Sequence, residues 1–127
     1  MHKIYLLILF CTAQMRAAAQ PGYESVSEKF LTFYNQQVPD SIFNLYAPAL
    51  KEKLPLPKTE AVITGLHVQY GDLKSLRLLK LDSGFCVYKA GFSHQTLALL
   101  LALDSNQLIE GYRLVPYNKE QYPEAIK

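Results

Sequence analysis

The first candidates for binding a ligand are two arginines that lie inside apolar stretches. Arg77 alternates with Leu79 and Leu81, and Arg113 alternates with Val115. An arginine on an apolar strand face must either extend its guanidinium group to solvent or find a polar partner. The pattern therefore predicts either charges on the solvent face of a sheet or a half-apolar pocket that orients a carboxylate-bearing or other polar ligand.

Tyrosines in the same stretches are the second kind of candidate ligand contact. The chain has 9 tyrosines and 6 phenylalanines but no tryptophan. Tyrosine combines a large apolar ring with one polar end, and it is enriched at interfaces and at the borders of cavities. The candidate ligand-binding residues are therefore Arg77, Tyr88, Tyr112 and Arg113.

Residues for catalysis or metal binding are sparse. After Ala19 the chain contains only His67, His94 and one cysteine, Cys86, and it has no H-x-x-x-H, C-x-x-C, H-E-x-x-H or G-x-S-x-G motif. Cys86 lies in an apolar run, so we expect a buried and unreactive thiol. Either histidine could act as a base, but the sequence offers no paired acid. We therefore predict no catalytic residue, no metal and no cofactor.

The elements that must position these residues begin with helices. Apolar residues at helical spacing predict a first helix that starts at the capping box Ser25–Glu28 and stops before Pro39. Asp40 is expected to cap a second helix, residues 48–54 to form a further short turn, and Pro57 to start a third helix that Gly71 ends.

The second half of the chain has the two-residue period of strands. Short polar turns separate four strand candidates, which cover residues 73–81, 85–92, 96–103 and 108–115. Connections this short join antiparallel neighbours. The sequence therefore predicts a single α+β domain, in which the N-terminal helices pack on one face of a curved four-stranded antiparallel sheet. Such a cone-shaped arrangement leaves either a cavity or a flat dimerisation face.

The first 19 residues have the order of a secretory signal peptide. A basic residue near the start is followed by the apolar run Ile4–Ala13 and by the small residues Ala17–Ala19. A run of about 10 apolar residues is too short to span a bilayer, which takes about 20. We expect cleavage before Gln20, giving a periplasmic or secreted chain with a domain at residues 20–116 and a polar C-terminal tail at 117–127.

Removal of the leader would leave a neutral chain. The leader contains Lys3 and Arg16 and no acidic residue, so 11 of the 13 basic residues remain against 11 acidic ones. A neutral chain has no electrostatic field that would attract nucleic acid or an anionic membrane surface. We therefore expect neither nucleic acid nor stable membrane insertion.

Several short segments support a family resemblance: Phe43-Asn44-Leu45-Tyr46, Gly71, Val87-Tyr88-Lys89 with Phe92, and Leu108-Ile109-Glu110-Gly111. With them, residues 30–116 resemble a bacterial domain-of-unknown-function family of the cystatin-like, nuclear-transport-factor-like superfamily. The resemblance implies a cystatin-like fold and no catalytic motif. Domains of that family commonly precede a secreted α/β-hydrolase or serine-hydrolase domain. This chain ends about where the linker would begin, so we expect the domain to stand alone, and a hydrolase supplied by another chain remains open.

These observations predict an exported, non-enzymatic binding or assembly module. Its expected partners are a second copy of the chain or a protein of the cell envelope. The alternative is a small-molecule pocket protein that binds an amphipathic or carboxylate-bearing ligand between its helices and its sheet.

Overall fold

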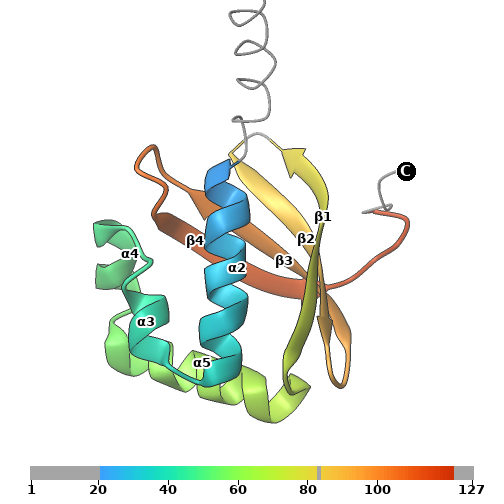
Figure 1. The fold of residues 1–127 in the computed structure, drawn as a ribbon, viewed down its shortest axis with the longest axis horizontal. Coiled ribbons are helices and arrows are strands. Elements are labelled where there is room, and N and C mark those ends of the chain that lie inside the picture. The colour runs from blue at the N-terminus through green and yellow to red at the C-terminus, as the bar shows by residue number, and fades with distance from the viewer. Residues whose placement is uncertain (1–20, 83, 122–127) are drawn as a thin grey trace, which may run out of the picture.

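The computed structural model describes residues 21–82 and 84–121, and within them helices are followed by strands (Figure 1). The helices are α2 (Pro21–Gln36), α3 (Pro39–Phe43), α4 (Pro48–Lys53) and α5 (Leu56–Tyr70). The strands are β1 (Leu73–Asp82), β2 (Phe85–Phe92), β3 (Thr96–Leu103) and β4 (Ile109–Pro116). The predicted α+β class, with helices packed against a four-stranded antiparallel sheet, is confirmed. The predicted leader and the end of the tail lie outside the described residues.

Prolines mark where α3, α4 and α5 begin. Helix α2 already includes Pro21, the first described residue, so Ser25 lies inside the helix and the predicted start at the capping box is wrong. Pro39 and Pro48 open α3 and α4, and Pro57 is the second residue of α5. The first backbone N–H groups of a helix have no partner within it, so a residue that lacks one is tolerated at these positions.

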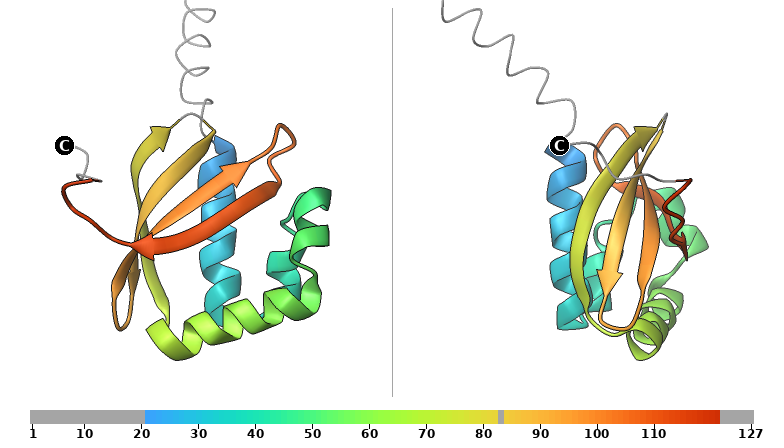
Figure 2. Two further views of the ribbon diagram at one scale, coloured as in Figure 1. Left: turned by 180° about the vertical axis from the view of Figure 1, so that it is seen from behind. Right: turned by 90° about the vertical axis from the view of Figure 1, so that its right-hand side faces the viewer.

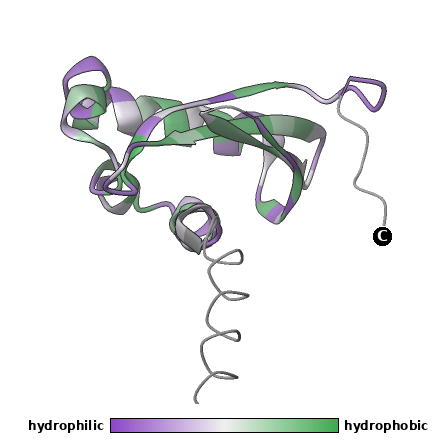
Figure 3. Ribbon diagram, turned by 90° about the horizontal axis from the view of Figure 1, so that it is seen from above, coloured by the Kyte–Doolittle hydropathy of each residue, from purple (hydrophilic) through white to green (hydrophobic). Residues whose placement is uncertain are grey.

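The sheet is a simple meander. Each strand pairs antiparallel with the next one in the chain, in the order β1-β2-β3-β4, so β1 and β4 are the edge strands. The strands curve, with α2 running along them and α5 crossing below their lower end (Figure 2). Seen from above, the strands are coloured mainly hydrophobic, and α2 lies below one side of the sheet (Figure 3).

The main core lies between the helices and the inner face of the sheet. Helical side chains such as Phe30, Tyr34, Ile42 and Ile63 are buried there against Leu99 of the central strand β3. Burial of a large apolar side chain contributes about 1.5–3 kcal/mol, so this layer supplies most of the stabilisation. In the part of the chain that the structure describes, no helix has the length and apolar composition needed to cross a membrane.

A smaller apolar cluster lies on the outer face of the sheet. Leu79, Val87 and Ala98 are buried there, and Tyr117 from the start of the tail packs against them. The Lys89 ammonium group lies 5.2 Å from the centre of the Tyr117 ring. The beginning of the predicted tail is thus part of the packed domain.

The helical layer closes one end of the edge strand β4. Tyr46 forms a parallel bridge with Ile109, and the backbone N–H of Ala47 donates to the Ile109 carbonyl oxygen at 2.8 Å. The N–H of Ile109 in turn donates to the Leu45 carbonyl oxygen, also at 2.8 Å. The start of β4 is therefore covered by backbone pairing. Among the described strands, none covers the outer edge of β1.

Candidate functional site

The four predicted ligand contacts are divided between the two faces of the sheet. Tyr88 and Tyr112 belong to the core on the helix side. Arg113 directly follows Tyr112, and Arg77 lies opposite Lys89, which directly follows Tyr88. Neighbouring residues of a strand point to opposite faces. Both arginines therefore lie on the outer face. Arg113 and Tyr112 nevertheless line one hollow together, whereas Arg77 lines neither that hollow nor the cavity beside Tyr88.

An irregularity in β1 changes which of its leucines share a face with Arg77. The pairing register shifts between Leu78 and Lys80, so Leu81 lies opposite Cys86 on the helix side. Leu79 packs on the outer face with Arg77, as its spacing predicts, but Leu81 does not. A bulge adds one residue to a strand and reverses the faces that follow it.

Tyr112 is a core residue and lines no cavity on the helix side. Its hydroxyl group is 2.7 Å from that of Tyr46, and its ring meets Phe30 edge-on with 5.4 Å between the ring centres. The Tyr46 hydroxyl is in turn 3.2 Å from Thr59 Oγ1. Burial is the main cause that raises the pKa of Tyr112, so the phenol stays neutral. We conclude that Tyr112 stabilises the junction of helices and sheet.

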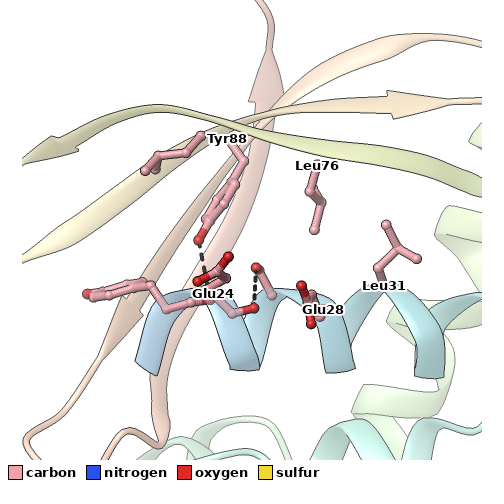
Figure 4. A pocket seen from close by; sticks show the side chains of 8 residues that line it. Glu24, Glu28, Leu31, Leu76 and Tyr88 are labelled. Carbon is pink, nitrogen blue, oxygen red and sulfur yellow. Dashed lines mark hydrogen bonds between the residues drawn. The ribbon is translucent and has the colours of Figure 1, made fainter. Parts of the chain in front are cut away.

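Tyr88 is the one predicted contact that borders a cavity on the helix side. A groove of about 430 Å³ lies between the first half of α2 and strands β1 and β2. Figure 4 shows Glu24, Glu28 and Leu31 of α2 on one side of it, with Leu76 and Tyr88 across the gap. We call this cavity the α2–β1 groove; its lining residues are Tyr23, Glu24, Ser27, Glu28, Leu31, Leu76, Leu78 and Tyr88.

The α2–β1 groove combines apolar walls with negative charge. Leu31, Leu76 and Leu78 supply apolar surface, and Leu78 remains 42% exposed. Glu24 and Glu28 are both exposed, and they are the only charged residues in the lining. The Tyr88 hydroxyl donates to the Tyr23 carbonyl oxygen at 3.4 Å, and burial raises the pKa of Tyr88 to about 12. The phenol is therefore neutral, and the site is acidic through its two glutamates.

Arg113 borders a different and shallower hollow on the outer face. This hollow measures about 340 Å³ and is mostly apolar, and the predicted contact Tyr112 lines it together with Phe85, Leu100 and Ala102. It is separated from the α2–β1 groove by the thickness of the sheet. Arg113 is thus placed to meet a partner of the outer face, and Arg77 lines neither cavity.

Both histidines lie near the end of α5, outside the lining of the groove, and the structure gives His67 an acidic partner that the sequence did not predict. His67 Nε2 lies 2.9 Å from Asp72 Oδ1 at the junction of α5 and β1, in a solvent-exposed pair. Cys86 is fully buried, and burial raises the pKa of its thiol to about 11, so it is protonated at neutral pH. Among the described residues, no three or more histidine, cysteine or acidic side chains are grouped to hold a metal ion.

Sequence reasoning missed most of the groove. The apolar spacing that predicts the first helix includes Val26 and Phe30, and both are buried in the core. Glu24, Glu28 and Leu31 follow one another at steps of four and three residues, which places them on one face of a helix. That spacing was a usable signal, but only the structure shows that this face borders β1.

Comparisons with known proteins supply no family for the chain. No family model, no curated protein and no solved structure matches it. The family resemblance of residues 30–116 therefore stays a prediction, and function has to be argued from the site. What characterises this chain is a helix-covered antiparallel sheet with one acidic, half-apolar groove between α2 and β1.

Proposed function

We propose that the chain is an exported, non-enzymatic binding module whose ligand occupies the α2–β1 groove. The observation that supports this proposal is the groove itself, a cavity of about 430 Å³ beside a closely packed core. Ligand pockets typically have volumes of about 300–1,000 Å³ and combine apolar walls with a few polar groups. The groove meets both criteria.

The charges of the groove narrow the chemistry of the ligand. Glu24 and Glu28 would repel a carboxylate, and the arginines that were expected to attract one lie on the outer face. Leu31, Leu76 and Leu78 favour an apolar body. The ligand is therefore amphipathic, with a cationic or hydrogen-bond-donating group directed toward α2.

Export rests on the order of residues in the first 19 positions, with cleavage before Gln20. An exported binding module meets its ligand in the cell envelope or outside the cell, where the partner is an envelope protein or a small molecule. Self-association is a second form of the proposal, favoured by the apolar hollow beside Arg113 on the outer face.

Two tryptophan variants test the proposal. Leu78→Trp fills the groove from a side chain that is already 42% exposed, so folding should be retained. Val68→Trp is the matched control, because Val68 is 78% exposed on α5 and lies outside the groove lining. Amide resonances would be followed by NMR during titration with octylamine and with octanoate. The mass of the exported chain would be measured on the same samples.

We expect octylamine to shift the resonances of the groove residues in the unmodified chain and in Val68→Trp, with octanoate binding more weakly. Leu78→Trp should abolish these shifts. Shifts that are absent, or that persist unchanged in Leu78→Trp, contradict a ligand in the groove. A dimer that forms in every variant without groove shifts would instead support an assembly module. An exported mass that begins at Met1 would contradict cleavage before Gln20.

A further inference from the structure

Among the described residues, no strand pairs with the outer edge of β1, and one end of this edge is occupied by a side chain that imitates a neighbouring strand. The Asn35 amide of α2 donates from Nδ2 to the Leu73 carbonyl oxygen at 2.8 Å. The Leu73 N–H donates to Asn35 Oδ1, also at 2.8 Å. The backbone polar groups of Leu73 therefore point away from β2, toward the open side of the sheet.

The same backbone orientation recurs where β1 lines the groove. Leu73 lies opposite Phe92, Leu76 opposite Ala90 and Leu78 opposite Tyr88. These three β2 residues are every second residue of their strand. In an antiparallel pair the direction of the backbone N–H and C=O groups alternates from one residue to the next, so every second residue has the same direction. The N–H and C=O groups of Leu76 and Leu78 thus face the open edge, as those of Leu73 do.

The C-terminal end of α2 contacts this edge of β1, and the groove lies beside the N-terminal half of the helix. Asn35 near its C-terminus contacts the start of β1, and the groove lies beside its first half, between Tyr23 and Leu31. The right-hand view of Figure 2 shows α2 running beside β1. The space between them is bounded by a helix face and by a strand edge that presents backbone donors and acceptors.

We infer that the ligand of this groove is an extended peptide segment of another protein, which adds as a strand to the open edge of β1 and directs basic side chains to Glu24 and Glu28. This inference rests on the proposed function and specifies its ligand. Strand addition at an exposed sheet edge supplies affinity through backbone hydrogen bonds and specificity through alternate side chains.

The spacing of the two glutamates agrees with that of a strand. Residues four apart on a helix have Cβ atoms about 5–6 Å apart. Alternate side chains of an extended strand repeat every ~6.8 Å, since each residue rises about 3.4 Å. Glu24 and Glu28 can therefore each receive one of two alternate basic side chains. Arg77 lies on the outer face and does not line the groove, so it does not oppose them there.

The test uses capped hexapeptides in which lysine and valine alternate. A second peptide replaces lysine with glutamate. Two more carry N-methyl groups on every second amide, one in each register, which removes backbone donors and preserves the side chains. Binding to the full chain would be measured by NMR titration at low and high salt. The protein variants are Glu24→Gln/Glu28→Gln and, as a matched control, Glu52→Gln/Glu60→Gln, whose exposed glutamates lie outside the groove.

We expect the lysine peptide to shift and protect the amides of Leu76 and Leu78. N-methylation in one register should weaken binding about tenfold or more, and N-methylation in the other should change it little. Glu24→Gln/Glu28→Gln should weaken binding several-fold and reduce its dependence on salt, and the control should behave as the unmodified chain.

Each contrary result identifies what has failed. If both N-methylated peptides bind as tightly as the parent at the groove, strand addition is wrong and the groove remains a binding site. If octylamine binds in the groove and no peptide does, the peptide is wrong and the proposed function stands. If neither binds to the folded chain, both proposals fail. A preference for the glutamate peptide contradicts the charge argument.

Discussion

At the scale of single residues, three hydroxyl groups in the core form a chain. Thr59 Oγ1 lies 3.0 Å from the Leu54 carbonyl oxygen and 3.2 Å from the Tyr46 hydroxyl, which is 2.7 Å from the Tyr112 hydroxyl. Thr59 can donate its one proton to either of its two neighbours, and the Tyr46 and Tyr112 hydroxyl groups share a second hydrogen bond. Tyr46 is the middle link, and Tyr112 is the outer one.

The two tyrosine-to-phenylalanine variants should therefore differ in stability. Tyr46→Phe removes the hydrogen-bond partner of the Tyr112 hydroxyl and leaves that group unpaired, which costs about 1–3 kcal/mol. Tyr112→Phe leaves Tyr46 bonded to Thr59 and should cost about 1 kcal/mol or less. Urea unfolding of both variants measures the difference. Equal losses, or a larger loss for Tyr112→Phe, would show that the chain of hydroxyl groups does not depend on Tyr46 as its middle link.

At the scale of elements, the strands follow from the sequence more closely than the helix starts do. The predicted strands agree with the structure to within one residue at each end, because polar turns interrupt a two-residue period. The capping-box pattern at Ser25 predicted a helix start that the structure contradicts, because α2 already includes Pro21 and the pattern also occurs inside a helix. The register shift after Leu78 has no local signal, because it depends on how β1 pairs with β2.

Gly71 and Gly84 make a matched pair for testing how the elements are joined. Both have positive φ, 84° at the end of α5 and 89° in the β1–β2 turn. A Cβ at Gly71 would lie 2.8 Å from Ser93 Cβ, and one at Gly84 would meet nothing within 4 Å. Gly84→Ala should therefore cost about 1–2 kcal/mol for its backbone conformation alone, and Gly71→Ala more. Thermal or urea unfolding measures this order, and equal costs would contradict the close approach to Ser93.

At the scale of the whole molecule, the groove arises from elements that are distant in sequence. Residues 23–31 supply one wall and residues 76–88 the other, and the Asn35 contact with Leu73 sets where α2 meets β1. Composition and periodicity predict each element separately but not the gap between them. The alternation of residues along single strands predicted Arg77 and Arg113 as ligand contacts. The groove is instead lined by residues of α2 and of the neighbouring strands. A site of this kind is visible only after the elements are assembled.

The buried phenols and the thiol of the core make the stability of the whole domain sensitive to alkaline pH. Burial raises the pKa of Cys86 from its ordinary 9.0 to about 11, and it raises that of Tyr34 from 10.0 to about 12. Above pH 9 the unfolded chain ionises these groups and the folded chain does not, so the free energy of unfolding should fall as pH rises. This contribution is complete below pH 9 and is lost progressively toward pH 11–12.

For Cys86 the loss should be on the order of 2–3 kcal/mol, since one pKa unit corresponds to about 1.4 kcal/mol. Urea unfolding between pH 8 and 11 measures the slope. Cys86→Ala should be less stable at pH 8, because it removes buried volume, but its stability should fall less steeply between pH 9 and 10. The tyrosines act in both proteins, so this difference in slope should persist to about pH 11 and then disappear. An unchanged slope in Cys86→Ala would show that the thiol ionises equally in the folded and unfolded chains, and that its burial does not contribute to alkaline unfolding.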